Sequence, residues 1–303
     1  MLSKKSGKAP TSGYRVPFWL PYLMIAPSII SIATFIIYPL LNLARLSLWR
    51  TNLMNPAQNE FVGLANFRQL FTRDDFWHSL RNTVVYTVSV VAIVTILALI
   101  IAMWIHKSSR FHGMVQGAIF IPHIVSILSV SLIWAWMFSV DGGLFNSLLI
   151  AMGFSPLRWL QSSDTAMMSI VIVMVWKSLG YFVLIFVAAR NAIPESIYEA
   201  AALDNARPIV VFFKITLPML SPQLFFVLVI MTIASFRMFE AVHIMTRGGP
   251  NLATNTLVYY IYSNVFEVMR IGLAASAAMV LTVVISLLTL LYFTVLSKQV
   301  HYQ

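Results

Sequence analysis

The sequence predicts an all-α integral membrane protein with about six transmembrane helices. Of its 303 residues, 59% are hydrophobic and only 10% are charged, whereas soluble domains are roughly 45–50% apolar and about 25% charged. The apolar residues gather into long runs, each near the roughly 17–25 residues that a helix needs to cross a hydrocarbon core. These runs cover residues 20–48, 83–105, 115–140, 165–189, 219–239 and 271–296.

The composition also excludes several kinds of function. The sequence has no cysteine, which excludes a disulfide framework, a thiolate nucleophile and a cysteine-based metal site. A net charge of +10 can indicate a nucleic-acid partner, but here Lys and Arg are spread thinly between the apolar runs and form no dense basic helix. We therefore expect a lipid bilayer around the chain and no nucleic acid.

Prolines and one amphipathic segment add detail to the predicted spans. Pro27 and Pro39 lie in the first run and Pro122 in the third, and each is expected to kink its helix because proline lacks an N–H and its ring clashes with the preceding turn. Between the first two runs, residues 61–71 place aromatic and aliphatic side chains at helical spacing. This segment predicts a helix that lies in the membrane interface.

Small residues at a spacing of four mark two places where helices can pack closely. Gly113 and Gly117 lie at the start of the third span, just before and just inside it, and Gly272 and Ser276 lie in the last one. Such pairs let two helix backbones approach each other, although the pattern is a weak signal. Close packing is the only role that we predict for them.

We expect one transmembrane domain over residues 19–297, with a cytoplasmic tail at 1–18 and a short cytoplasmic tail at 298–303. The orientation follows from Lys and Arg, which are enriched in cytoplasmic loops. Placing both termini inside puts more of these residues on the cytoplasmic side and more of the acidic residues outside. The same topology places the long loop 191–218 in the cytoplasm.

That cytoplasmic loop predicts a helix, a turn and a second helix. Pro194 suits the first turn of the first helix, and a run of alanines suits its interior. Asn205 suits the turn, because asparagine tolerates the left-handed conformation that often ends a helix. Pro208 then suits the start of the second helix, and Pro218 allows a sharp turn into the fifth span.

The same loop carries a family resemblance. It is similar to the EAA signature of binding-protein-dependent ABC importer permeases, which is matched here by Glu199, Ala200, Ala201, Asp204, Ala206, Ile215, Leu217 and Pro218. Further segments resemble the permeases for carbohydrates and glycerol 3-phosphate, namely Tyr38-Pro39, residues 61–67, Ile121-Pro122, Trp176-Lys177 and Gly248-Gly249-Pro250. One residue departs from the pattern: Asn205 stands where the family usually has glycine, and the turn should survive because asparagine adopts positive φ more readily than other residues.

The resemblance implies a type I ABC importer permease with a cytoplasmic coupling helix, in the inner membrane of a prokaryote. Its partners would be a second homologous permease in a heterodimer, two ABC ATPase subunits and an extracytoplasmic solute-binding protein. ATP and magnesium would be bound by the ATPase subunits, with no cofactor or metal on this chain and no catalysis by it. Glu199, Ala200 and Ala201 would dock on an ATPase, and the transported solute would be a carbohydrate or glycerol 3-phosphate.

Charged and aromatic residues in the fourth and fifth spans suggest a substrate path. Lys177, Arg237 and Glu240 would be costly at bilayer depth unless they face a cavity or a partner, and Arg237 and Glu240 are spaced to pair on one helical face. Sugar rings stack on aromatic surfaces such as those of Trp176, Tyr181 and Phe239. The alternative is that these charges lie near the interfaces or hold helices together.

Two more predictions concern the outer face and the rival functions. Gly248-Gly249-Pro250 predicts a sharp turn, which in similar permeases lies near the docking site of the binding protein. A secondary transporter and a membrane-embedded lipid enzyme remain alternatives, but only Glu240 is an acid deep in a span and no acid, base or metal cluster is evident. The sequence also has no phosphate-binding G-x-x-x-x-G-K-[ST] loop, so an ATPase would have to be a separate chain.

Overall fold

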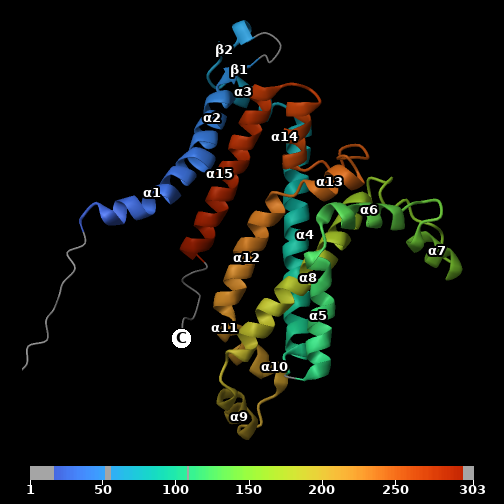
Figure 1. The fold of residues 1–303 in the computed structure, drawn as a ribbon. Coiled ribbons are helices and arrows are strands. Elements are labelled where there is room, and N and C mark those ends of the chain that lie inside the picture. Colours follow the sequence, from blue (N-terminus) through green and yellow to red (C-terminus); the bar gives the residue numbers. More distant parts are fainter. Residues whose placement is uncertain (1–16, 52–55, 108, 296–303) are drawn as a thin grey trace, which may run out of the picture. The chain divides into compact units, whose positions relative to one another are not determined.

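The computed structural model describes residues 17–51, 56–107 and 109–295 (Figure 1). The predicted tail at 298–303 and nearly all of the tail at 1–18 lie outside these residues. The chain forms two compact units, Met1–Arg45 and Leu46–Gln303. Among the described residues, five helices are long and apolar enough to cross a membrane, or up to six if one bent pair counts as a span. The all-α membrane fold is therefore confirmed.

The first unit is a single apolar helical stretch. It contains α1 (Leu20–Ile32), a π-helical turn η1 (Ala33–Ile37) and the start of α2 (Tyr38–Ser47). Pro27 lies inside α1 without ending it. The π turn comes directly before Pro39, and the N–H of Tyr38 bonds to the carbonyl of Ala33, five residues back. The predicted distortion at Pro39 thus takes the form of a widened turn.

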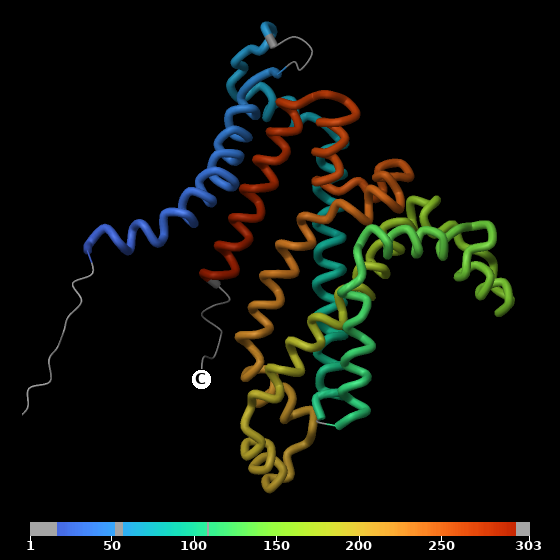
Figure 2. The backbone as a smooth tube through the Cα atoms, viewed as in Figure 1, coloured from blue at the N-terminus to red at the C-terminus, as the bar shows by residue number. Residues whose placement is uncertain are grey.

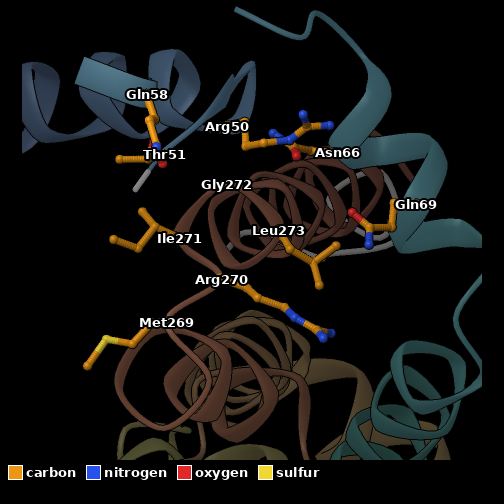
Figure 3. A pocket seen from close by; sticks show the side chains of 10 residues that line it. All are labelled: Arg50, Thr51, Gln58, Asn66, Gln69, Met269, Arg270, Ile271, Gly272 and Leu273. Carbon is orange, nitrogen blue, oxygen red and sulfur yellow. The ribbon is translucent and has the colours of Figure 1, made fainter. Parts of the chain in front are cut away.

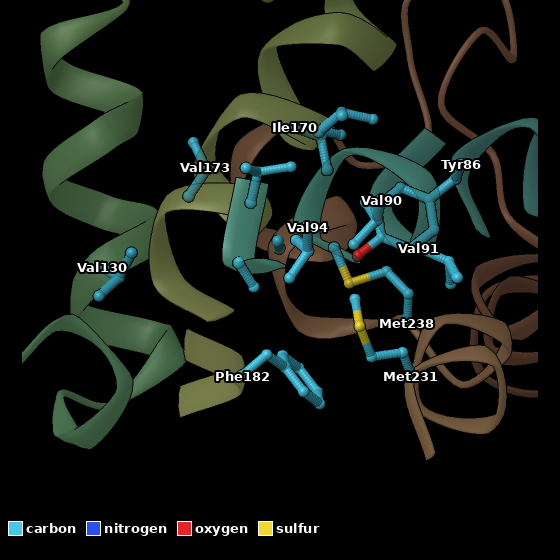
Figure 4. Packing of buried hydrophobic residues seen from close by; sticks show 14 of the residues in the cluster. Tyr86, Val90, Val91, Val94, Val130, Ile170, Val173, Phe182, Met231 and Met238 are labelled. Atoms are coloured by element: carbon cyan, nitrogen blue, oxygen red, sulfur yellow. The ribbon is translucent and has the colours of Figure 1, made fainter. Parts of the chain in front are cut away.

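The second unit is built on two long helices, α4 (Asp74–Ile105) and α8 (Ala166–Asn191), which pack together along with α5 (Arg110–Ile124) and α12 (Ser221–Phe236). Their shared core is aliphatic and aromatic, with Val94, Val173, Val183 and Phe186 fully buried, and Figure 4 shows part of it. Gly180 brings α8 against α5, since a Cβ at this position would overlap the backbone carbonyl of Ile119. Gly113 and Gly117 instead face open space, so their predicted close packing does not occur within this chain.

The third predicted span is broken. Residues 115–140 form no continuous helix, because α5 ends at Ile124 and α6 (Ile127–Met137) runs at 94° to it. The break lies at Val125 and Ser126, whose backbone is extended. Pro122 lies inside α5 and does not end it. The kink was therefore predicted in the correct span, but it lies at Val125 and Ser126 and not at Pro122. A short helix α7 (Leu144–Ala151) follows α6.

The fifth predicted span is also interrupted. The helix α12 ends at Phe236, and α13 (Glu240–Met245) begins after three residues outside helix. The helix α14 (Leu257–Phe266) then leads to α15 (Ile271–Val295), which forms the last span. In α15 Gly272 and Ser276 are buried, and a Cβ on Gly272 would overlap the carbonyl oxygen of Trp49. The predicted close packing at this pair is confirmed.

Small elements form the two ends of this unit (Figure 1). One end has a hairpin of β1 (Trp49–Arg50) and β2 (Glu60–Phe61), with a 3₁₀ turn η2 (Pro56–Gln58) in its loop and the helix α3 (Ala65–Phe71) after it. The helix predicted at 61–71 is therefore confirmed over Ala65–Phe71 only, and its place in the membrane interface stays a prediction. The opposite end is the loop after α8, with α9 (Glu195–Leu203), α10 (Pro208–Val211), the π turn η3 (Phe212–Thr216) and α11 (Leu217–Met219).

Candidate functional site

The loop between α8 and α12 has the predicted helix-turn-helix form (Figure 2). The first helix, α9, begins after Pro194, and Asn205 has a φ of +49° directly after it. The N–H of Ala206 donates to the carbonyl of Ala201 at 3.0 Å, and the N–H of Asn205 donates to that of Ala202 at 3.0 Å. These two bonds form a Schellman motif, so asparagine fills the left-handed position that favours glycine.

The residues of the signature divide between an exposed side and a packed side. Glu199, Ala200 and Asp204 are exposed, whereas Ala201 retains only 8% exposure. Ala201 and Ile215 line a groove of about 440 Å³ beside α9. The structure therefore offers Glu199 and Ala200 for contact with another protein, while Ala201 sets how closely α9 approaches the segment after it.

A side-chain clamp that was not predicted ties α9 to both of its neighbours. Arg190, near the end of α8, is 7% exposed, and its guanidinium lies 3.6 Å from the ring centre of Tyr198 and 3.7 Å from a carboxylate oxygen of Glu195. The hydroxyl of Tyr198 lies 3.1 Å from Oγ1 of the buried Thr216 in η3. One tyrosine in α9 therefore contacts α8 through its ring and η3 through its hydroxyl.

The signature residues nearest the fifth span lie in a short helical segment before it. Ile215 belongs to η3, and Leu217 and Pro218 belong to α11. Together α10, η3 and α11 form the helical segment Pro208–Met219, which ends at the fully buried Leu220 before the span that begins at Ser221. The interruption therefore falls two residues after Pro218, and the sharpness of the turn stays a prediction. Leu220 is the one residue that connects this segment to α12.

Lys177 holds the broken third span. Its ammonium donates to the carbonyls of Val125 at 2.7 Å, His123 at 3.2 Å and Pro122 at 3.3 Å. These carbonyls lie at and beyond the end of α5, where a helix leaves its last carbonyls without internal partners and a cation is stabilising. Of the two interpretations given above, this geometry favours the one in which the charge holds helices together.

The aromatic candidates are already stacked on other rings. Tyr181 lies parallel to His123 at 4.5 Å between ring centres, and Trp176 lies 5.3 Å from Trp134 in α6. Both contacts join α8 to the two parts of the broken span. Trp176 and Tyr181 keep part of their surface exposed, so each has one face available for a further contact.

The predicted pair of Arg237 and Glu240 does not form. Arg237 follows the last residue of α12 and Glu240 is the first of α13, so the two residues are not on one helical face. Both are exposed, and no ion pair joins them among the described residues. Phe239 lies between them, stacks on His243 at 5.1 Å and packs at a tilt against Tyr262 at 4.9 Å between ring centres. This cluster could not be predicted from sequence spacing, because Tyr262 lies in a different helix.

The outer turn around Gly248-Gly249-Pro250 forms as predicted and is firmly held. Gly248 has a φ of +76°, and a Cβ there would lie 2.8 Å from the ring of Tyr259. Oγ1 of Thr254 donates to the carbonyl of Gly249 at 2.7 Å. Burial, with a smaller effect of the Glu267 carboxylate, raises the pKa of the Tyr259 phenol.

Two polar residues at the start of α4 attach this turn to the bundle. The amide of Asn82 donates to the carbonyls of Leu252 at 2.7 Å and Asn255 at 3.1 Å. Next to it, Oγ1 of Thr83 accepts the N–H of Leu257 at 2.8 Å. Neither residue belongs to a motif, so sequence reasoning missed both.

Comparison with known proteins decides the family. The model of the family "Binding-protein-dependent transport system inner membrane component" matches residues 94–302. The chain belongs to this family. The permease protein UgpA of the sn-glycerol-3-phosphate transport system is 34% identical in Yersinia pestis bv. Antiqua over 291 residues, covering 94% of this chain and 96% of the relative. The same protein in Agrobacterium fabrum is 34% identical over 286 residues, covering 93% and 96%.

Solved structures agree on the fold. A chain of a bacterial ABC transporter involved in the import of the acidic polysaccharide alginate matches with a TM-score of 0.81 and 22% identity, over 92% of this chain and 96% of that one. A second alginate transporter structure, in complex with a periplasmic protein carrying alginate pentasaccharide, matches with a TM-score of 0.80 and 22% identity, over 90% and 92%.

The family assignment settles the general function. The chain is the permease subunit of an ABC importer and a multi-pass inner-membrane protein, which works with ATPase and periplasmic binding-protein partners. The resemblance inferred from the EAA signature is confirmed, and the secondary transporter and the lipid enzyme receive no support.

Proposed function

We propose that this chain is one of two homologous permeases in a heterodimer that imports a carbohydrate or a glycerol-3-phosphate-like solute. The observation that carries the proposal is the 34% identity to glycerol-3-phosphate permeases over 94% of the chain. The named solutes of the relatives and of the structural neighbours are both anionic, which favours a phosphorylated or acidic solute within this class.

The proposal includes an orientation. Both termini lie in the cytoplasm, which is supported by the distribution of Lys and Arg. The loop with α9 and the turn at Gly248-Gly249-Pro250 emerge at different ends of the second unit (Figure 1). The first then faces the ATPase subunits, which bind ATP and magnesium, and the second faces the solute-binding protein. This chain supplies no cofactor or metal site.

Coupling would pass through α9. Glu199 and Ala200 are exposed for docking on an ATPase, so closure of the ATPase dimer would displace α9. The Tyr198 hydroxyl bond to Thr216 and the contact of Arg190 with the Tyr198 ring would transmit this displacement to α12 and α8. Ala201, Asp204, Asn205 and Ala206 shape the turn that keeps α9 in place.

A matched pair of bonds tests this transmission. Tyr198→Phe and Thr216→Val each remove one neutral hydrogen bond, so solute uptake per ATP hydrolysed should fall about 2- to 10-fold, and the double variant should be no worse than either single one. The control is Tyr292→Phe, which removes a similar bond to Thr232, at 3.0 Å, between α12 and α15. Equal losses in the Tyr198 and Tyr292 variants would refute transmission by the clamp.

The solute path would run along the exposed face of α8 and past the three residues between α12 and α13. Trp176 and Tyr181 offer ring faces there, and Phe239 with the exposed Arg237 and Glu240 offers aromatic and charged groups. Lys177 would position the broken span rather than contact the solute. An anionic solute would favour Arg237 as its partner.

The experiment that tests the function is uptake into proteoliposomes. The complete complex would be reconstituted with its binding protein, and ATP-dependent uptake of sn-glycerol 3-phosphate, maltose and an acidic oligosaccharide would be compared. We expect saturable uptake of one of these solutes that requires both ATP and the binding protein. Uptake that persists without ATP, driven by an ion gradient, would overturn the proposal.

A further inference from the structure

A cavity of about 540 Å³ with both polar and apolar side chains in its lining lies between the β hairpin, α3 and the first turn of α15 (Figure 3). It is at the end of the second unit opposite α9 and away from α8, so it is separate from the proposed solute path. The side chains used below belong to Arg50, Asn66, Gln69, Arg270 and Gly272, all of which line the cavity.

The cavity carries positive charge without an acid in its lining. Arg50 forms an ion pair with Glu60 at 3.3 Å, but both side chains are about two-thirds exposed at 69% and 66%, and such surface pairs are weak. The Arg270 side chain forms no ion pair within 4.0 Å among the described residues, although its charge also acts on the Asp75 carboxylate of α4, which does not line the cavity. In Figure 3 Arg50 lies above α15, Arg270 lies below it, and Gln69 lies beside it on α3.

The walls of the cavity are fixed by tight packing. The amide of Asn66 donates to the carbonyls of Ser47 at 2.8 Å and Trp49 at 3.0 Å. A Cβ on Gly272 would overlap the Trp49 carbonyl oxygen, so glycine is required for this approach of α15 to β1. These contacts fix the backbone of α3, β1 and α15 around the cavity, and the exposed side chains of Arg50, Gln69 and Arg270 extend from that backbone.

The surroundings indicate what the ligand is. Next to the cavity, α3 and its flanks expose large apolar side chains, with Phe61 at 61%, Leu64 at 70% and Trp77 at 50%. Aromatic belts of this kind lie at the level of lipid headgroups. Phosphate is the anionic group found at that depth, and arginine binds phosphate well because its planar donors match the oxygen atoms.

We propose that this cavity binds a phosphate group through Arg270, Arg50 and Gln69. The phosphate can come from the headgroup of a lipid in the outer leaflet or from a free phosphate monoester. The inference rests on the proposed orientation but not on the identity of the transported solute. The test of this proposal measures lipid binding and not transport. The phosphate site can therefore be refuted while the proposed transport function is upheld, and the transport function can be refuted while the phosphate site is upheld.

The test measures lipid binding by the complete transport complex. The complex would be delipidated in non-ionic detergent and titrated with phosphatidylglycerol, with binding followed by native mass spectrometry and diolein as the lipid without phosphate. We expect binding of phosphatidylglycerol but not of diolein, and a loss of about tenfold in affinity in Arg270→Gln. Arg68→Gln is the matched control, because Arg68 is also exposed on α3 but does not line the cavity.

The source of the phosphate is decided by competition. Displacement of phosphatidylglycerol by millimolar sn-glycerol 3-phosphate would assign the cavity to a free monoester, and resistance to displacement would assign it to a lipid. Thermal melting of each variant shows whether it is folded, and Arg50→Gln provides a second variant if Arg270→Gln is not. Equal affinities in Arg270→Gln, Arg50→Gln and Arg68→Gln, or equal binding of diolein, would overturn the proposal, as would a wild-type complex that binds no phosphatidylglycerol.

Discussion

The two ends of the second unit both contain short-range hydrogen bonds, but they differ in how far along the sequence their longest side-chain hydrogen bonds reach. The two bonds of the turn at Asn205 span three and five residues, and the bond from Tyr198 to Thr216 spans 18. At the other end, Asn82 reaches Leu252 across 170 residues, and Ser276 reaches Ser47 across 229. In the proposed orientation these are the inner and the outer end of the unit. The inner end can therefore form as a local motif, while the outer end depends also on the assembled bundle.

The largest effect should come from the exposed surface of the local motif. Glu199→Arg reverses a charge that makes no ion pair in the described chain, so stability should change by less than about 0.5 kcal/mol. The affinity for an ATPase subunit should fall by more than about tenfold, because two like charges brought together at an interface cost several kcal/mol. The measurements are thermal melting of the complex and co-purification of the ATPase subunits.

The matched control for this variant is Glu267→Arg, a charge reversal on an exposed residue at the outer end. It should leave the ATPase subunits bound. Wild-type retention of the ATPase by the Glu199→Arg complex would remove α9 from the docking surface. For Ala201 the structure changes the expectation, because this side chain is packed and a bulky replacement would displace α9 itself.

Lys177→Met should have the next largest effect. It tests hydrogen bonds between residues that are distant in sequence. It removes an ammonium that binds three carbonyls on a segment more than 50 residues away, and a hydrogen bond to a charged group contributes about 1.5–3 kcal/mol. We expect a lower melting temperature of the purified complex, with the solute KM unchanged in the molecules that remain folded. Wild-type melting together with a raised KM would restore Lys177 to the solute path.

Asn82→Ala should have a smaller effect that is confined to the outer end. It leaves the carbonyls of Leu252 and Asn255 without this donor, at a cost of about 1–2 kcal/mol. Because the turn at Gly248-Gly249-Pro250 is then less firmly held, stimulation of the ATPase by the binding protein should fall while basal ATPase activity stays the same. Asn59→Ala, on the hairpin loop, serves as the comparison, and a similar fall in both variants would argue against a specific role of this turn.

The features that depend on residues close in sequence could be predicted from the sequence, and those that depend on distant residues could not. The start of α9 at Pro194, the turn at Asn205 and the second helix at Pro208 depend on local backbone preferences, and all three were predicted. The 94° bend at Val125 and Ser126 was not predicted, because Lys177 stabilises the free carbonyls at the break from another helix. The expected pair of Arg237 and Glu240 was wrong for a related reason, since periodicity alone does not reveal that α12 ends just before Arg237.

The smallest effect compares two asparagines with the same backbone conformation, one at each end. Asn205 and Asn251 both have a φ of +49°, and glycine adopts this conformation without the steric cost of a Cβ. Asn205→Gly should raise stability by no more than about 1 kcal/mol, because it completes the usual end of a Schellman motif.

Asn251→Gly should gain less than Asn205→Gly, because the outer turn is fixed by contacts from α4 and an added glycine mainly increases the freedom of the unfolded chain. Thermal melting of the two variants, with uptake per ATP as a second measure, checks the difference. A larger gain for Asn251→Gly would mean that the outer turn is strained despite its long-range bonds. The turn at Asn205 would then carry less backbone strain than the turn at Asn251. In that case the family's preference for glycine at position 205 would need a reason other than backbone strain.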